Sequence, residues 1–304
     1  MNGQLLKMTN ALTLNLHNMD DLGLMGGKMG AALFYYELSR YTDIETYNDM
    51  ADHLLDDVLN NVVKLETGSI ERGIAGIGWG INYLIRKSFI DASDDIFVDL
   101  EQTLFSKENV SFDIHFSTLS PAIYLLSKSE ENRTLGGYDR WVTELLNTCS
   151  YYFLHIYDNK KKPIDLINSM LYFLIELQKQ KIHLMESSKL IWKILNYLLS
   201  GADIVHDING DSMILLSLLE QLDDSTPLKK ETLAKLNKIK YDSWSVEALK
   251  KIWWQQILFS CRVKSRITMG DINQILISTD NNEVNVGELI VPLGLYLMNI
   301  YKSE

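Results

Sequence analysis

Two short clusters of histidine and acidic residues are the parts of this sequence best suited to carry out chemistry. One contains His206, Asp207 and Asp211, and the other is formed by Asp113 and His115. Histidine and carboxylate side chains together can bind a metal ion or move a proton as an acid/base pair. A structural role is the alternative, because Asp207 and Asp211 can also cap the start of a helix by accepting hydrogen bonds from its free N–H groups.

Two other side chains, Lys28 and Trp79, are candidates for ligand contacts because they lie within glycine-rich segments. Their alternative role is to pack in the core or to join the two helices of a hairpin. The neighbouring residues Trp253 and Trp254 can likewise form an aromatic platform or fill space. The sequence contains no P-loop, no Gly-x-Ser-x-Gly, no His-Glu-x-x-His and no Cys-x-x-Cys motif.

Composition limits the class of protein. The chain has 304 residues, of which 46% are hydrophobic and 23% charged, as expected of a globular protein rather than a disordered one. It contains only 4 prolines, which favours helices over many short strands. The formal charge of -11 would repel a polyphosphate, so we expect no nucleic-acid partner.

The sequence also bears on the compartment. Residues 1–16 combine neither a basic start nor an unbroken apolar stretch, so no signal peptide is visible. The longest apolar run, 289–298, contains Pro292 and is shorter than the roughly 20 residues that cross a bilayer. Cys149 and Cys261 lie in hydrophobic helical patterns and are expected to be free thiols. We therefore expect a cytoplasmic protein that does not insert into a membrane.

A repeated glycine pattern indicates which elements position the candidate residues. The segment 23–33 (GLMGGKMGAAL) aligns without a gap on 73–83 (GIAGIGWGINY) at a shift of 50 residues, and 287–297 (GELIVPLGLYL) is a third copy. Glycine is expected where the backbone approaches closely at the start of a helix near a crowded axis. In the second copy, Gly73, Gly76 and Gly80 align with Gly23, Gly26 and Gly30. The third copy retains the first and last of these glycines, as Gly287 and Gly294.

Between these copies, a small residue followed by an apolar run recurs at similar intervals. The last interval is twice as long as the others, so we expect a further copy near residue 253. Each copy predicts an inner helix that is apolar all round, followed by an outer helix with one apolar stripe, such as 31–41 followed by 47–62. The anchors are Gly30, Gly80, Ala122, Ser169, Ser212 and Gly294. The other predicted outer helices cover 96–104, 141–157, 184–199 and 228–239.

A helix buried on every side needs neighbours on two sides, which a closed ring of helix pairs provides. The sequence therefore predicts an all-α fold, an (α/α) toroid of about seven helical hairpins, forming a single domain over residues 1–304.

Residues 23–34 and 71–84 resemble the glycine motifs of the lanthionine synthetase C-like (LanC-like) family. The resemblance covers the first 90 residues and the last 20, and rests on spacing alone between them. It implies a toroid of seven helical hairpins. It also implies that active members hold zinc in a central cavity and add a cysteine thiol of a precursor peptide to a dehydrated Ser or Thr. The metal would favour the thiolate at neutral pH.

The zinc ligands that the resemblance implies are missing from this sequence. In the family, one Cys precedes the fifth inner helix and an adjacent Cys-His pair precedes the sixth. Here the windows 205–211 and 244–254 contain no cysteine, and Cys261 lies too far along the expected helix to substitute. We therefore expect no zinc and no other cofactor, and we do not expect the family's thioether-forming reaction.

Three hypotheses about function remain. The first is a divergent or non-catalytic LanC-like protein that binds a peptide in a peptide-modification or export system. The second is a glycan-processing enzyme whose cavity carboxylates are Asp113, Asp207 and Asp211, which requires two of them roughly 5 to 9.5 Å apart. The third is a scaffold that recruits a partner enzyme.

Overall fold

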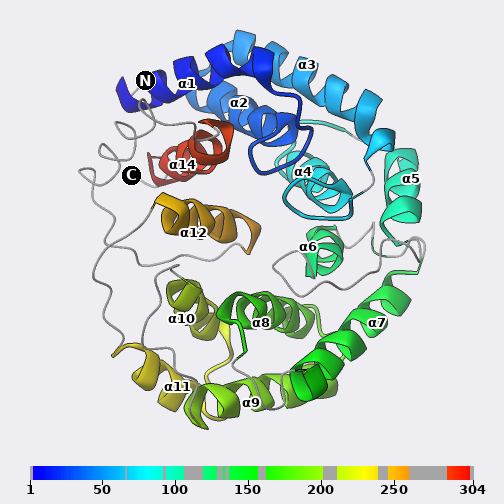
Figure 1. Ribbon diagram of the computed structural model, residues 1–304, viewed down its shortest axis with the longest axis vertical. Coiled ribbons are helices and arrows are strands. Elements are labelled where there is room, and N and C mark those ends of the chain that lie inside the picture. Colours follow the sequence, from blue (N-terminus) through cyan, green and yellow to red (C-terminus); the bar gives the residue numbers. More distant parts are fainter. Residues whose placement is uncertain are drawn as a thin grey trace. The chain divides into compact units, whose positions relative to one another are not determined.

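The computed structural model describes residues 3–65, 67–91, 94–105, 119–128, 133, 137–156, 162–200, 211–238, 246–259 and 286–301. Every regular element in these ranges is a helix, and none is a strand (Figure 1). The predicted all-helical class is confirmed for this part of the chain. The α-helices are α1 (Gly3–Asn15), α2 (Lys28–Thr42), α3 (Glu45–Asn61), α4 (Ile74–Arg86), α5 (Asp94–Leu104), α6 (Ser120–Ser127), α7 (Tyr138–Tyr151), α8 (Ile164–Lys179), α9 (Leu184–Ser200), α10 (Asp211–Gln221), α11 (Lys229–Leu236), α12 (Val246–Leu258) and α14 (Val286–Tyr301).

The chain groups into two compact units. Unit 1 contains residues 1–113, 123–136 and 267–304, and unit 2 contains residues 114–122 and 137–266. Helix α6 is therefore divided between them, while each other helix belongs to one unit. Whether residues 1–304 form a single domain stays a prediction.

Two patterns of burial alternate along the chain, as the sequence predicts. Residues 29–38 of α2 and 166–175 of α8 are all buried, so these helices have neighbours on every side. In contrast, α3 buries only Ala51, Leu55 and Val58, which lie on one stripe. We keep the name inner helix for α2, α4, α6, α8, α10, α12 and α14, which coincide with the predicted anchors, and outer helix for the odd-numbered helices.

Helix α1 is an element that the sequence reasoning missed, and it joins the two ends of the chain within unit 1. It buries Leu5, Met8 and Leu12 and packs against α14, which in turn packs against α2 (Figure 1). The first and last inner helices are therefore direct neighbours, covered by α1.

The predicted alignment of the glycine segments is wrong by four residues. Gly27 and Gly73 are the residues that directly precede α2 and α4, and both have extended backbone. Gly30 and Gly76 are each the third residue of their helix, and a Cβ on either would lie 2.1 Å from the carbonyl oxygen six residues earlier. The structural repeat is therefore a shift of 46 residues, which carries 27 to 73 and 30 to 76.

Backbone hydrogen bonds follow the same shift. In each copy the loop before the helix folds back so that its carbonyl groups accept bonds from the first turn. The equivalent pairs are Lys28 N to Asp21 O (2.8 Å) with Ile74 N to Thr67 O (2.9 Å), and Gly30 N to Gly23 O (3.4 Å) with Gly76 N to Ser69 O (3.3 Å).

Glycines in the middle of inner helices have a different role, which is to let a neighbouring helix approach. A Cβ added to Gly80 in α4 would lie 2.4 Å from the terminal methyl group of Met29 in α2, which is too close for both to fit. A Cβ added to Gly294 in α14 would lie 2.3 Å from the ring of Phe34 in α2. Gly80 and Gly294 are therefore packing positions, and neither is the structural equivalent of Gly30. Gly287 lies against the Gly26 carbonyl oxygen, 3.0 Å from its Cβ position.

The contact between α1 and α2 includes a buried phenol. The hydroxyl of Tyr35 shares a hydrogen bond of 2.8 Å with Thr13, and its ring stacks on Tyr47 with centroids 6.1 Å apart. Burial raises the pKa of Tyr35 to about 12. Because a tyrosine in the unfolded chain ionises near pH 10, the folded state keeps a proton that the unfolded state loses above that pH.

The stability that this proton contributes is fully present below pH 10 and is lost as pH rises through about 12. We expect Tyr35→Phe to be less stable than the wild type at pH 8, by about 1 kcal/mol for the lost hydrogen bond. As pH rises from 10 to 12, however, the urea concentration at the midpoint of unfolding should fall less steeply for Tyr35→Phe than for the wild type. Tyr151→Phe, which changes an exposed ring, is the control. Parallel curves for wild type and Tyr35→Phe would contradict the assignment.

Candidate functional site

The structure describes three of the seven chemically active candidates. Asp211, Lys28 and Trp79 lie inside the described ranges. The others, Asp113, His115, His206 and Asp207, lie outside the described residues, so their convergence on one site stays a prediction.

Asp211 forms a partly buried ion pair that joins two inner helices of unit 2. It is the first residue of α10, and its two carboxylate oxygens lie 2.8 and 3.0 Å from the Nζ atom of Lys251 in α12. The Asp211 side chain is 8% exposed and that of Lys251 is 30% exposed. The buried carboxylate is thus paired with a lysine whose side chain is partly exposed.

A third inner helix contributes Asn168 to the same place. Its Nδ2 donates a hydrogen bond of 2.8 Å to the backbone carbonyl of Asp211, and the residue is fully buried on α8. The Oδ1 atom of Asn168 is also buried and accepts no hydrogen bond from the described residues. We call Asn168, Asp211 and Lys251 the Asp211 cluster. It ties α8, α10 and α12 together where α10 begins.

The Asp211 cluster combines a carboxylate, an ammonium and a buried amide. The Asp211 carboxylate lies in the first turn of α10, beside the ammonium of Lys251. An ammonium has three N–H donors, and a partly exposed one can give a bond to an incoming carboxylate or peptide carbonyl. A carboxylate engaged in this way is poorly placed to act as one of two glycosidase carboxylates.

The aromatic residues of α12 fill the core. Trp253 and Trp254 are both buried, and Phe259 stacks on Tyr172 of α8 with ring centroids 4.4 Å apart and 20° between planes. Of the two roles that the sequence left open for the tryptophan pair, the structure therefore shows space filling.

Lys28 and Trp79 also make contacts within unit 1. The ammonium of Lys28 pairs with Asp57 near the end of α3, so it joins the two helices of one hairpin. Trp79 is buried in α4 and stacks on Tyr83, with centroids 5.5 Å apart. Both side chains belong to unit 1, whereas the Asp211 cluster belongs to unit 2.

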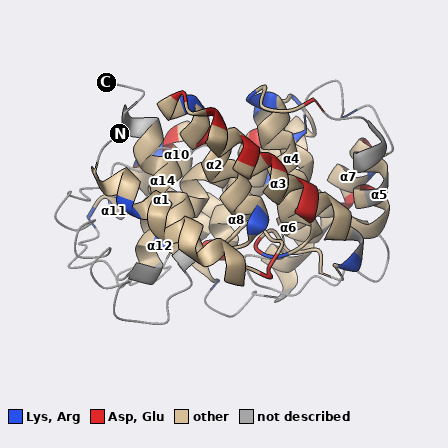
Figure 2. Cartoon of the chain, turned by 90° about the horizontal axis from the view of Figure 1, so that it is seen from above, with Lys and Arg blue, Asp and Glu red and all other residues tan. Residues whose placement is uncertain are grey.

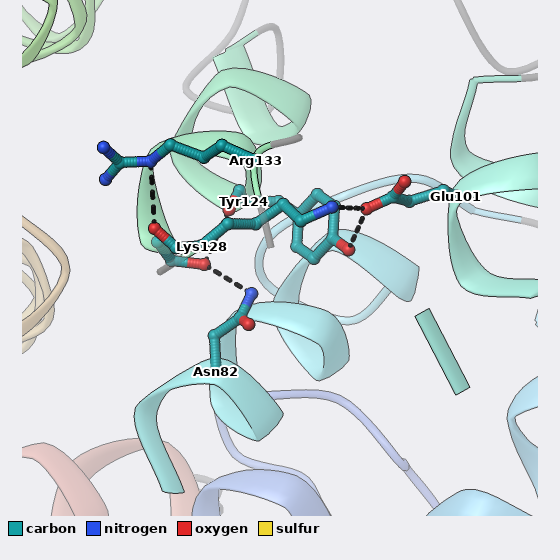
Figure 3. A network of polar contacts seen from close by, with 6 residues as sticks. Asn82, Glu101, Tyr124, Lys128 and Arg133 are labelled. Atoms are coloured by element: carbon teal, nitrogen blue, oxygen red, sulfur yellow. Dashed lines mark hydrogen bonds and ion pairs between the residues drawn. The ribbon is translucent and has the colours of Figure 1, made fainter. Parts of the chain in front are cut away.

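A second polar cluster, in unit 1, was not anticipated from the sequence. The buried ammonium of Lys128 and the hydroxyl of Tyr124, at 2.8 Å, both bind Oε1 of Glu101 in α5 (Figure 3). Burial is the main cause that raises the pKa of Tyr124, and the Glu101 charge adds to it. At the same end of α6, Asn82 of α4 donates to Ser127, 2.9 Å away. This network fixes α6 to both α4 and α5, which is a structural role.

No group of three or more His, Cys, Asp or Glu side chains suited to a metal ion occurs within the described residues. The windows 205–210 and 244–245 lie outside them, so the absence of zinc stays a prediction. Among the described helices, none combines the length and the apolar character needed to cross a membrane. Comparisons with protein-family models, with curated proteins and with solved structures found no match.

Proposed function

We propose that this chain is a zinc-less, divergent LanC-like protein that folds as a toroid of helical hairpins and binds a peptide at the Asp211 cluster. The repeated loop-and-helix starts at α2 and α4, and the packing of α14 against α1 and α2, support the toroid. A closed ring needs its last inner helix beside its first, and unit 1 has this arrangement.

The observation that carries the proposed function is the pairing of Asp211 with Lys251. These residues lie in α10 and α12, the fifth and sixth inner helices, and the metal ligands implied by the resemblance directly precede these two helices. An ammonium fixed by a carboxylate offers one positive charge and one N–H donor, which suits a peptide carbonyl or carboxylate. It supplies no Lewis acid to activate a thiol, which favours binding over cyclisation.

The test uses the variant Asp211→Asn/Lys251→Met, which removes both charges and leaves neither one buried alone. We expect wild-type protein to bind members of a synthetic array of peptides rich in Ser, Thr and Cys, and the double variant to bind the same members at least about tenfold more weakly. Lys7→Met, which changes an exposed lysine of unit 1, is the control and should bind like the wild type.

Metal analysis tests the other half of the proposal. Protein purified without chelator should contain far less than one equivalent of zinc per chain. Stoichiometric zinc would overturn the zinc-less assignment. Equal peptide binding by wild type and a folded double variant would overturn the assignment of the site. None of the described contacts favours the glycan-processing or scaffold hypothesis over peptide binding.

A further inference from the structure

The outward face of α9 combines apolar and basic side chains. Its other face is buried through Leu190, Ile194 and Leu198, which is why the helix packs on α8. On the outward face, Trp192 is 50% exposed and Met185 is 64% exposed. Trp192 is the one tryptophan among the described residues with an exposed side chain. Half-exposed tryptophans are typical anchors of protein interfaces.

Two lysines flank this tryptophan. Lys189 and Lys193 are exposed, and neither forms an ion pair within the described part of the chain. They are one helical turn apart, and like charges at this spacing destabilise a helix by a few tenths of a kcal/mol. The patch of Lys189, Trp192 and Lys193, which we call the α9 patch, is thus a basic spot on a chain of formal charge -11.

Helix α3 in unit 1 presents the complementary surface. Glu45, Asp49, Asp52 and Asp56 are exposed, and their spacing places them on one stripe of the helix. Helix α3 has no Lys or Arg, and Figure 2 shows its acidic residues in red. Within the described residues, neither Glu45 nor Asp49 forms an ion pair. The residue before the helix, Ile44, is an exposed apolar side chain at 43%.

We propose that the α9 patch of one copy of this chain docks on the start of α3 of a second copy. Lys189 and Lys193 are four residues apart, as are Glu45 and Asp49, and both steps correspond to about 6 Å along a helix. Two ion pairs can therefore form together while Trp192 packs against Ile44. Exposed ion pairs contribute little each, so burial of the indole supplies most of the affinity and the contact is weak.

The two surfaces differ, so the contact is head-to-tail. One copy retains a free α3 stripe and the other retains a free α9 patch. Overall, two copies repel each other because both are acidic. At about 0.15 M salt the Debye length is about 8 Å, which screens that repulsion but leaves the contacting charges coupled. Association should accordingly be strongest near this ionic strength and weaker at about 1 M salt.

Sedimentation velocity over a range of protein concentrations tests this proposal. We expect wild-type protein to self-associate with a dissociation constant of roughly 10–100 μM, as for a small transient interface. The reversals Lys189→Glu/Lys193→Glu and Glu45→Lys/Asp49→Lys should each raise this constant at least about tenfold. Lys230→Glu/Lys238→Glu, the same charge change on exposed lysines beyond α9, is the matched control and should not raise it.

Mixing the two reversed variants gives the sharpest outcome. A reversed α9 patch on one protein then faces a reversed α3 stripe on the other, so the equimolar mixture should associate where each variant alone does not. Wild-type protein that stays monomeric at every concentration would overturn the proposal, as would a mixture that stays monomeric. Binding to vesicles of phosphatidylcholine and phosphatidylserine without self-association would also overturn it, in favour of a membrane surface.

Discussion

Replacing Gly76 with alanine is expected to lower the free energy of unfolding by roughly 3 kcal/mol, among the larger effects of any single substitution in this chain. The added Cβ would lie 2.1 Å from the carbonyl oxygen of Ile70 and 2.9 Å from its carbonyl carbon. These are backbone atoms of the loop that folds back over the start of α4, so they cannot move without breaking the hydrogen bonds of that loop. Urea unfolding followed by circular dichroism measures the loss.

The register of the repeat makes the prediction specific. If the shift is 46 residues, Gly30→Ala meets the same obstacle, the carbonyl oxygen of Leu24 at 2.1 Å, and should cost about as much. The nearest atoms to a Cβ in Gly80→Ala belong to the Met29 side chain rather than to the backbone, so this substitution should cost less. Gly3→Ala in α1 meets no atom within 4 Å and should be neutral or slightly stabilising. Equal costs at Gly76 and Gly80 would contradict this register.

That register shows what the sequence could and could not predict. The glycines in these segments are three or four residues apart, which is about one helical turn, so two alignments that differ by one turn both place glycine on glycine. Counting identical glycines favours a repeat of 50 residues over one of 46. The true register is set by hydrogen bonds between the loop and the first turn, such as Gly76 N to Ser69 O. These bonds are made by backbone atoms. In the residue types they are reflected only by the glycine pairs Gly27/Gly73 and Gly30/Gly76, which are fewer than the three identical glycines found at a shift of 50.

The helices themselves were predictable, because a helix that buries one or more faces carries apolar residues at helical spacing in its sequence. The anchors near 122, 169 and 212 fall in α6, α8 and α10, and the weak copy expected near 253 falls in α12. Helix α1 was not predicted, although Leu5, Met8 and Leu12 form an apolar stripe along it.

Only one residue of the Asp211–Lys251 ion pair was predicted from the sequence. Asp211 was a candidate because it belongs to a local cluster, whereas its partner Lys251 is 40 residues away, and the acidic residue nearest to Lys251 in the sequence of α12 is Glu247. One signal could have found it. Lys251 directly precedes Ile252, Trp253 and Trp254 in an inner helix, where an ammonium is stable only beside a carboxylate.

The same reasoning predicts a large effect at the buried ion pair of unit 1. Lys128→Met keeps the aliphatic stem but leaves Glu101, which is 17% exposed, without its ammonium. Removing one partner of a buried pair typically costs about 3–5 kcal/mol, because the remaining charge is still kept from water. We expect about 3 kcal/mol here, measured by urea unfolding, since Glu101 retains some solvent contact and the hydroxyl of Tyr124.

A double variant separates the charge from the packing. In Lys128→Met/Glu101→Gln neither charge remains, and the glutamine oxygen can still accept the hydrogen bond from Tyr124. The double variant should therefore be more stable than Lys128→Met alone, with a coupling of about 1–3 kcal/mol. Arg140→Met, which breaks the exposed pair with Glu144, is the control and should cost at most about 0.5 kcal/mol.

The ordering of these variants decides what holds α6 in place. A Lys128→Met variant as stable as Arg140→Met would mean that the ammonium contributes no more than a surface charge. A double variant as unstable as Lys128→Met would mean that packing of the side chains, rather than the pairing of their charges, fixes α5 against α6. Only a large single loss that is partly recovered in the double variant is explained by an uncompensated Glu101 carboxylate beside Tyr124.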